Sequence, residues 1–498
     1  MSGPLPARAL RLTAGIASAL LISCGCEVGP NYKEPRVETP GSFSNATTQA
    51  TTAPTTSPAT TRQSVTDAES RPWVEWWTRF NDSQLDSLVA RALAANHELA
   101  IARARVQEAR AMERIAKSGL HPTIDLSAAA LKTRGSAAGF GFPFGLPGEE
   151  ANLFHLGFDA TYEVDLFGGV RRSIEAAGAV ADATVNERRS VQVSLLGEVA
   201  RNYIGLRALQ RRLEVAQANL ADQRRTLDVV QRRFKNGLAP NFDLVRATAQ
   251  VAETESSIPP LQAGIRQTMY GLAVLLGEQP TALDQELTTA APIPPVPPKV
   301  PVGMPSELLR RRPDVMRAER LLAAATAQQG VATAEFFPHL ILGGTAGVES
   351  RHTSDLFSQH DPSSGFYAAG PAAGWTLFDG GKRRANLDLS KARVAAALAA
   401  YEGTVLAALR DVESSLTAYS HDQTRRESLT GLVAQNAEAV RIAQREYDNG
   451  LIDLLDVLQV QRNLYASQDA LAQSDQAVSS DLVALYKALG GGWETPKS

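Results

Sequence analysis

The sequence predicts a mainly α-helical fold with two β-hairpins, built as a tandem repeat. Three observations support this fold class. The segment Phe234–Ala249 (FKNGLAPNFDLVRATA) recurs in closely similar form at Tyr447–Arg462 (YDNGLIDLLDVLQVQR). Apolar residues recur at seven-residue intervals over two very long stretches, which is the period of helices that supercoil against a neighbour. Two other stretches alternate apolar and polar residues, which is typical of strands with unlike faces.

Composition narrows the class of protein. The chain has 498 residues, two cysteines and a formal net charge of -3. Both cysteines precede residue 30, so no disulfide framework is expected. A nucleic-acid partner would usually require a basic face, which a pI near 6.2 does not suggest. We expect no membrane-spanning helix outside the N-terminus.

The N-terminus predicts export and lipid anchoring. Arg8 and Arg11 precede an apolar run, which is the pattern of a signal peptide over residues 1–23. The sequence Leu-Ile-Ser-Cys that ends at Cys24 resembles a bacterial lipobox, so a covalent lipid on Cys24 would anchor the chain. Cys26 is a rival position, and a secreted protein with a chance cysteine is the alternative. No other cofactor is expected.

The rest of the chain divides into a tether, two repeats and a linker. Residues 24–70 contain the anchor and a Thr-rich stretch too poor in apolar residues to fold by itself. Residues 71–290 form the first repeat, residues 291–305 a Pro-rich linker, and residues 306–498 the second repeat. The repeats keep the same order of elements, which indicates one structural plan used twice.

The first repeat begins with a helix, expected from about residue 82 to 118 after an aromatic cluster. A strand over 123–133 and a clearer one over 154–162 then predict a hairpin. A helical run of about 65 residues follows and ends at the pair Asn236 and Gly237, where Gly suits a helix C-cap. A second helix restarts near Asp243. Pro259 and Pro260 predict a kink or break within it.

The second repeat follows the same order. Strands over 340–350 and 365–377 precede a long helix that ends at Asn449 and Gly450. Its seven-residue series contains one polar interruption, Arg426, and a return helix restarts near Asp456. If two short helices stack end to end, they match one long helix in length, so the two repeats predict a bundle of four rods.

The hairpins supply four strands per chain. Outer-membrane barrels close with at least about eight strands, so one chain cannot close a barrel but two or three chains could. Export, lipid anchoring and alternating strand faces favour that interpretation. A soluble sheet is the alternative that the alternation alone leaves open.

Several motifs together resemble the outer-membrane efflux proteins, that is, the TolC-like outer membrane factors of the NodT lipoprotein branch. The motifs are Val28–Tyr32 (VGPNY), Trp76-Trp77 with Phe80 and Asp82, Tyr162-Glu163 with Asp165 to Gly168, Leu308–Val315 (LLRRRPDV) and Leu377–Gly381 (LFDGG). The resemblance implies a trimer with a twelve-stranded transmembrane β-barrel in the outer membrane of a Gram-negative bacterium and a helical tunnel through the periplasm. It implies a periplasmic adaptor protein and an inner-membrane pump, of RND type, as partners. Its register favours Cys26 for the lipid, against the better local lipobox at Cys24.

The resemblance also implies a gate at the second-repeat turn. By position, the residues expected to line the closed pore are Leu455, Asp456, Gln459 and Arg462. Related channels tend to carry Asp where this chain has Gln459. Arg462 is the expected partner of Asp456, although Asp456 is also explained as a favourable charge in the first turn of a helix. The first-repeat turn, with Asp243 and Arg246, is expected to contact the adaptor.

The function predicted is passive passage of solutes out of the cell, gated at the periplasmic tip. A type I secretion channel and a lipid-anchored coiled-coil scaffold are the alternatives. The chain carries no phosphate-binding Gly loop or nucleophile motif, so no enzymatic activity is expected. The cluster around His352, Asp355, His360 and Asp361 lacks metal-ligand spacing, and no metal site is expected there.

Overall fold

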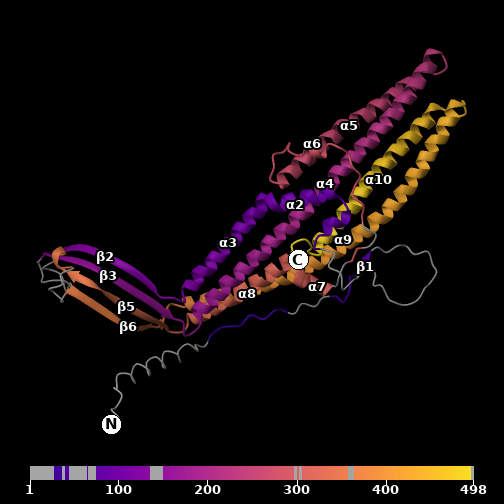
Figure 1. Ribbon diagram of the computed structural model, residues 1–498. Helices are drawn as coiled ribbons and strands as arrows, with labels where there is room; N and C mark the ends of the chain where they lie inside the picture. Colours follow the sequence, from indigo (N-terminus) through magenta and orange to yellow (C-terminus); the bar gives the residue numbers. More distant parts are fainter. Residues whose placement is uncertain are drawn as a thin grey trace, which may run out of the picture. The chain divides into compact units, whose positions relative to one another are not determined.

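The computed structural model describes residues 27–35, 40–43, 64–65, 74–134, 150–296, 300–301, 305–356 and 364–494. The predicted signal peptide, Cys24, Cys26, His360 and Asp361 lie outside the described residues, as does nearly all of the Thr-rich tether. The described chain forms two compact units, and each takes segments from both repeats (Figure 1). Unit 1 holds the residues up to Pro35, Val106–Thr184 and Ala318–Ala400, and unit 2 holds the remainder.

Unit 1 contains a four-stranded antiparallel sheet. Its strands are β2 (Thr123–Arg134), β3 (Glu150–Val164), β5 (His339–Ser350) and β6 (Gly365–Gly374), in the order β2-β3-β5-β6. Both predicted hairpins are therefore confirmed, and the central pair β3-β5 joins one repeat to the other. β2 and β6 are the outer strands, and each has one unpaired edge within the described chain.

Two helices of 67 residues run from unit 1 into unit 2. They are α4 (Gly169–Lys235) and α9 (Lys382–Asp448), each about 100 Å long at 1.5 Å per residue. Both helices begin next to an aspartate that accepts hydrogen bonds from backbone N–H groups. Asp165 accepts hydrogen bonds from the backbone N–H groups of Val170 and Arg171 at 3.1 and 2.9 Å, and Asp379 accepts from Gly381 and Arg383 at 3.0 and 3.2 Å. These carboxylates cap N–H groups that have no partner inside the helix.

The helix expected over residues 82–118 is two helices, α2 (Ser83–Ala95) and α3 (His97–Ser118). The prediction of a single helix was wrong because the backbone of Asn96 is extended, and the Asn96 side chain forms hydrogen bonds that stabilise this break. Its carbonyl oxygen accepts from the backbone N–H of Leu99 at 2.9 Å, and its amide donates to the carbonyl of Leu275 at 2.9 Å. The second repeat has the corresponding pair, α7 (Pro305–Arg311) and α8 (Pro313–Ala334).

Unit 2 is helical around an aromatic core. It adds the 3₁₀ turn η1 (Trp76–Phe80), α5 (Asn241–Leu275), α6 (Asp284–Leu287) and α10 (Leu454–Ala488), with a short parallel pair β1 (Ser64–Val65) and β4 (Val300–Pro301). In this unit, α5 lies along α4, and α10 lies along α9 (Figure 1). Trp76 stacks on Tyr486 with ring centroids 5.4 Å apart, and Tyr203 donates a 2.8 Å hydrogen bond to Asp82. Burial raises the pKa of Tyr203 to about 12, so its hydroxyl stays protonated as a donor.

The seven-residue series of both long helices point into the core of unit 2. Val199, Leu206, Val405, Val412 and Tyr419 are buried, which confirms the predicted stripe within this core, whereas Phe234 at the end of the α4 series is 38% exposed. The polar interruption, Arg426, is accommodated because it forms a 2.5 Å ion pair with Asp475 on α10.

Two helical expectations fail. α5 continues as one helix through Pro259 and Pro260, so the predicted break is wrong, and a kink there stays a prediction. Leu261 is buried directly after the two prolines, so packing holds the helix although the ring nitrogens donate nothing. α9 contains an 18-residue window with a mean hydropathy of 1.3, long and apolar enough to cross a membrane by composition alone, contrary to the expectation of none. Only 17% of that window is buried within the chain.

Candidate functional site

The two repeated turns of unit 2 have the same backbone geometry. Gly237 and Gly450 have φ of +73° and +74°, a region that suits Gly. The N–H of Leu238 donates to the carbonyl of Arg233, and the N–H of Leu451 donates to that of Glu446, both at 2.8 Å. These bonds span the helix end as in a Schellman cap, and they explain why an Asn-Gly pair follows each long helix.

The four residues predicted to line the gate lie on the first turns of α10. Leu455, Asp456, Gln459 and Arg462 are all exposed within one chain. Arg462 donates a 2.6 Å hydrogen bond to the side-chain oxygen of Gln459, whose amide donates to Asn463 at 3.0 Å. The side chains are therefore available to a neighbouring copy of the chain or to the pore.

The expected pairing of Asp456 with Arg462 is not formed within the described chain. Six helical positions separate the two residues, which places them about 120° apart around the helix axis. Gln459 lies three positions from Arg462 and takes the guanidinium instead. Within one chain the two side chains are therefore not paired, and their pairing in the assembled channel stays a prediction. Gln459 acts as an acceptor at the position where related channels tend to carry Asp.

Beneath the turns, an apolar cluster joins the two repeats. It contains Val230, Ala247, Ala443, Tyr447, Leu454, Val457 and Leu458. The guanidinium of Arg233, on α4, lies 4.3 Å from the centroid of the Tyr447 ring, on α9. It also donates to the carbonyl of Tyr447 at 3.2 Å. The end of the first long helix is thus attached to the end of the second by one side chain.

Sequence reasoning missed Arg233. It stands directly before the aromatic residue of the first turn, and the corresponding position of the second turn is Glu446. The repeated segment therefore carries opposite charges at equivalent positions. This difference in charge was the sequence feature that could have drawn attention to Arg233.

The first-repeat turn exposes more apolar surface than the second. Large side chains exposed there are Phe234, Leu238, Phe242 and Val245, and the most exposed is Leu238 at 75%. Arg246 lies over Phe242 at 4.8 Å and holds no contact with the second turn among the described contacts. The exposed large apolar residues of the second turn are Leu451 and Leu455.

The motif Val28–Tyr32 forms a clasp on unit 1, which we call the N-terminal clasp. Arg172 of α4, whose side chain is 3% exposed, forms ion pairs with Glu27 at 3.3 Å and Glu175 at 2.6 Å and donates to Asn31 at 2.5 Å. Tyr32 donates a 2.6 Å hydrogen bond to Glu319 on α8. Burial, followed by that bond, raises the Tyr32 pKa.

Glycines permit the close approach of the N-terminal clasp. Gly29 has a φ of +93°, and a Cβ there would lie 2.6 Å from the Cα of Gly330. Gly168, with a φ of +81°, leaves room for Glu27 at the start of α4. Both positions therefore exclude a side chain, and the segment that follows the predicted lipid anchor is fixed to unit 1.

The motif Leu308–Val315 supplies a second buried cation, in unit 2. Arg312 forms ion pairs with Asp314 at 2.7 Å and Asp411 at 3.2 Å, and donates to the carbonyl of Ala488 at 3.1 Å. Its side chain is 11% exposed. One residue thus connects the start of α8 with α9 and with the end of α10, which explains why the motif carries Arg at this position.

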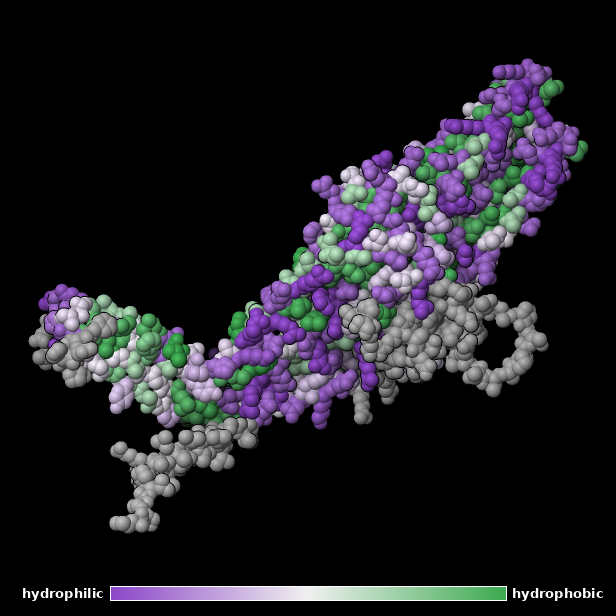
Figure 2. All heavy atoms as spheres, viewed as in Figure 1, coloured by the Kyte–Doolittle hydropathy of each residue, from purple (hydrophilic) through white to green (hydrophobic). Residues whose placement is uncertain are grey.

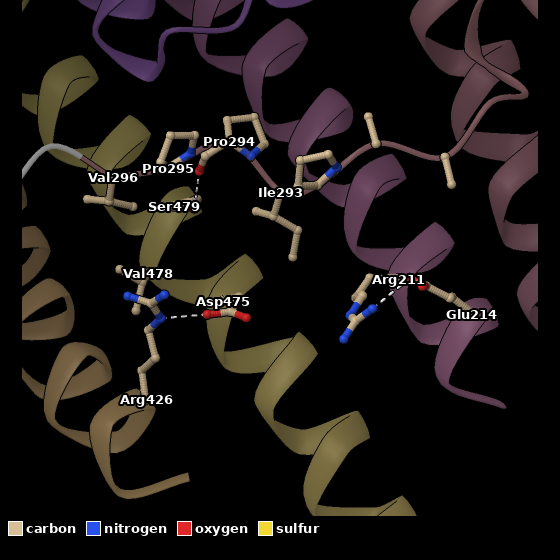
Figure 3. Close-up of a pocket in the computed structure, with 13 residues that line it drawn as sticks. Arg211, Glu214, Ile293, Pro294, Pro295, Val296, Arg426, Asp475, Val478 and Ser479 are labelled. Atoms are coloured by element: carbon tan, nitrogen blue, oxygen red, sulfur yellow. Dashed lines mark hydrogen bonds and ion pairs between the residues drawn. The ribbon is translucent and has the colours of Figure 1, made fainter. Parts of the chain in front are cut away.

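The Pro-rich linker covers a groove of about 520 Å³ in unit 2 (Figure 3). Two ion pairs lie in its walls, Arg426 with Asp475 and Arg211 with Glu214, and Ser479 donates to the carbonyl of Pro294 at 3.5 Å. The lining contains no His or Cys. The groove is where the linker packs on the helices, and its polar groups are engaged with one another.

Residues 88–278 and 304–491 match the family model described as outer membrane efflux protein. The chain belongs to this family. Its members are outer-membrane channels that extend into the periplasm, and the predicted fold class and function are confirmed at that level.

Two curated relatives and one solved structure illustrate the similarity. The chain is 30% identical over 484 residues to nodulation protein T of Rhizobium leguminosarum bv. trifolii, covering 95% of this chain and 96% of the relative. It is 34% identical over 433 residues to the pyoverdine export outer membrane protein OpmQ of Pseudomonas putida, covering 86% and 91%. The structure of the outer-membrane channel OprN superposes with a TM-score of 0.84 at 33% identity, covering 94% of this chain and 100% of that one.

Proposed function

We propose that three copies of this efflux protein form one outer-membrane channel through which solutes leave passively, supplied by a periplasmic adaptor and an inner-membrane pump of RND type. The observation that carries this proposal is the four-stranded sheet of unit 1. It has two unlike faces and two unpaired outer edges within the chain. Unpaired backbone groups are not stable in lipid, so the edges require strands from other copies, and three copies give twelve strands.

The apolar surface of a single chain supports assembly. Hydrophobic side chains gather over the strands, whereas hydrophilic ones dominate the tip at which α4 ends and α5 begins (Figure 2). The apolar window of α9 is mostly unburied in one chain. A large apolar surface left exposed by one copy is typical of an interface or of contact with lipid.

Deletion of the gene, followed by measurement of the intracellular accumulation of a panel of solutes, tests this function. We expect at least one solute to accumulate in the deletion strain and the wild-type gene to reverse the effect. An Asp456→Ala variant should restore export but admit more solute from outside. No change in accumulation or in envelope permeability would contradict the proposal.

The gate is proposed at the second-repeat turn, where Leu455, Asp456, Gln459 and Arg462 face away from their own chain. Around a threefold axis, three Asp456 carboxylates would repel one another and attract cations. Arg462 uses one N–H group for its bond to Gln459, so its other N–H groups can pair with Asp456 of a neighbouring copy. Loss of either charge should raise the leak of the closed channel.

The adaptor is proposed to contact the first-repeat turn, because that turn exposes the larger apolar surface beside Asn236, Gly237, Asp243 and Arg246. Leu238→Asp should abolish efflux in cells while the purified channel still conducts ions. Leu451→Asp, the equivalent change in the second turn, is the matched control and should leave efflux closer to wild type. Equal loss in both variants would remove the distinction between the turns.

The lipid anchor is proposed at Cys24, with Cys26 as the alternative. Glu27, directly before the N-terminal clasp, forms an ion pair with Arg172 of α4, so either cysteine would hold the acyl chains within a few residues of that contact. Mass spectrometry of the N-terminal peptide decides between them. A diacylated peptide that begins at Cys24 is expected, and one that begins at Cys26 would reassign the anchor.

A further inference from the structure

The two faces of the unit 1 sheet differ in charge. The strand register shows which residues lie on each face. Residues paired across antiparallel strands lie on the same face. One face, which we call the polar face, carries four carboxylates and two histidines and no Lys or Arg among the described strand residues. Its charged and titratable members are Asp125, His155, Asp159, Glu163, His339 and Glu349.

The opposite face is apolar along its middle. It carries Leu126, Phe158, Leu342 and Tyr367, with exposed fractions from 44% to 88%. Its charges, Lys132, Arg134 and Glu150, are confined to one end of the β2-β3 hairpin. This is the arrangement of a strand pair with one face toward lipid and the other toward a water-filled lumen.

A connected set of side chains crosses the polar face from β6 to β2. The ring of Phe366 lies over two glycines, since a Cβ on Gly347 would lie 3.0 Å from it and a Cβ on Gly157 3.3 Å. Phe366 also stacks on His155 with ring centroids 5.2 Å apart. The two glycines thus provide the space in which the aromatic ring lies flat against the sheet and reaches the next strand.

Ser127 connects His155 with the carboxylate of Asp159. The Ser127 hydroxyl donates a hydrogen bond to the Asp159 carboxylate at 2.9 Å. The Nε2 atom of His155 lies 3.2 Å from the Ser127 hydroxyl oxygen. A hydroxyl has one proton, which goes to the charged acceptor, so the imidazole Nε2–H donates to Ser127. Asp159 thus accepts a hydrogen bond from Ser127 at the end of a series of contacts that begins with the stack of Phe366 on His155.

Asp159 is also paired directly with Asp125 on β2. Two like charges opposite each other destabilise a strand pair unless they are well solvated or attract cations. No Lys or Arg of the polar face offsets them within the described strands. The described strand residues of the polar face therefore carry an excess of negative charge.

We propose that Asp159, held by Ser127 and His155 beside the Phe366 ring, makes the sheet end of the channel selective for cationic solutes. This inference rests on the proposed trimeric channel. It places a second selectivity element in the barrel lumen, separate from the gate at the helical turns. Three copies present twelve carboxylates of the polar face to one lumen, and acidic rings of this kind favour cations.

The test is the reversal potential of the purified full-length channel in a planar bilayer under a tenfold KCl gradient. The wild-type channel should prefer potassium over chloride. Asp159→Asn should lower the permeability ratio by about twofold or more at 0.1 M salt, where charges act over about 10 Å. Glu150→Gln removes the same charge from the same strand on the opposite face, and it should change the ratio far less.

A pair of cysteine variants tests the assignment of the faces without changing a charge. Thr161→Cys lies on the polar face and Tyr162→Cys on the apolar face. A charged thiol reagent should reduce the conductance of the first variant and not that of the second, compared with the wild type treated in the same way. The cationic reagent should react faster than the anionic one.

The outcomes separate the inference from the function on which it rests. Wild-type protein that forms no channels contradicts the proposed function. Channels whose ion preference is the same in wild type and Asp159→Asn, or that respond to the reagent at position 162 rather than 161, overturn the inference and leave the channel standing.

Discussion

The contact between Arg233 and Tyr447 predicts that one side chain helps to keep the periplasmic end closed. Arg233→Met retains the length of the side chain and removes the guanidinium, so the stack at 4.3 Å and the 3.2 Å hydrogen bond to the Tyr447 carbonyl are both lost. These are contacts between the end of α4 and the end of α9. If the second-repeat turn moves when the channel opens, the contact must break.

The magnitude follows from the two contacts. A cation–π contact contributes about 0.5–1 kcal/mol at an exposed site, and a hydrogen bond from a charged donor contributes about 1.5–3 kcal/mol. Arg233 is partly exposed, so the combined effect is taken as about 1–2 kcal/mol per chain. The equilibrium between attached and released turns should therefore shift by a factor of about 5–30 in each chain.

The assay is the closed-state leak of the purified channel in planar bilayers, together with the sensitivity of cells to a large antibiotic that does not normally cross the outer membrane. Arg233→Met should raise both. Arg246→Met is the matched control, because it removes a similar stack, on Phe242 at 4.8 Å, that connects nothing across the repeats. Equal leak in the two variants, or no leak in Arg233→Met, would refute the reasoning.

Three further predictions concern other buried contacts. Arg312→Met leaves Asp314 without its cation, while Asp411 keeps its ion pair with Arg410, and it should lower the apparent free energy of unfolding in denaturant by about 2–4 kcal/mol. Arg310→Met on the exposed side of α7 should not, and equal effects would contradict this assignment. Burial, together with Asp422, raises the pKa of Asp481 to about 7. The folded state therefore holds a proton that the unfolded state has lost, so the free energy of unfolding should fall as the pH rises from the ordinary carboxyl range through 7. Asp481→Asn should remove this pH dependence from a series of thermal unfolding measurements. Arg172→Met should release the N-terminal clasp and speed trypsin cleavage of the N-terminal segment, and an unchanged cleavage rate would show that the clasp does not depend on this cation.

The sequence was sufficient for features that depend on periodicity. Alternation located both hairpins, and the seven-residue series located α4 and α9, because a sheet and a helix each impose their own period on burial. The repeat of the Asn-Gly segment located both turns. Gly is needed there for a backbone conformation that other residues adopt at a cost, so the requirement is local and visible in the sequence.

Features that depend on one tertiary contact were not predictable in the same way. The break at Asn96 is stabilised by a carbonyl 179 residues away, and the unbroken α5 depends on packing around its two prolines. The partner of Arg462 within the chain depends on which residues share its side of α10. Gln459 does, and Asp456 does not. Arg233 and Arg172 were missed for the same reason, since a long side chain reaches partners that sequence spacing does not indicate.

The central claim is that three copies of this chain form one ion-conducting channel. Native mass spectrometry of the lipidated, detergent-solubilised protein, with planar-bilayer recording of the same sample, tests it most directly. We expect a particle of three chains that conducts ions. A soluble, non-conducting rod that remains after removal of the anchor would contradict it and would favour a periplasmic coiled-coil scaffold.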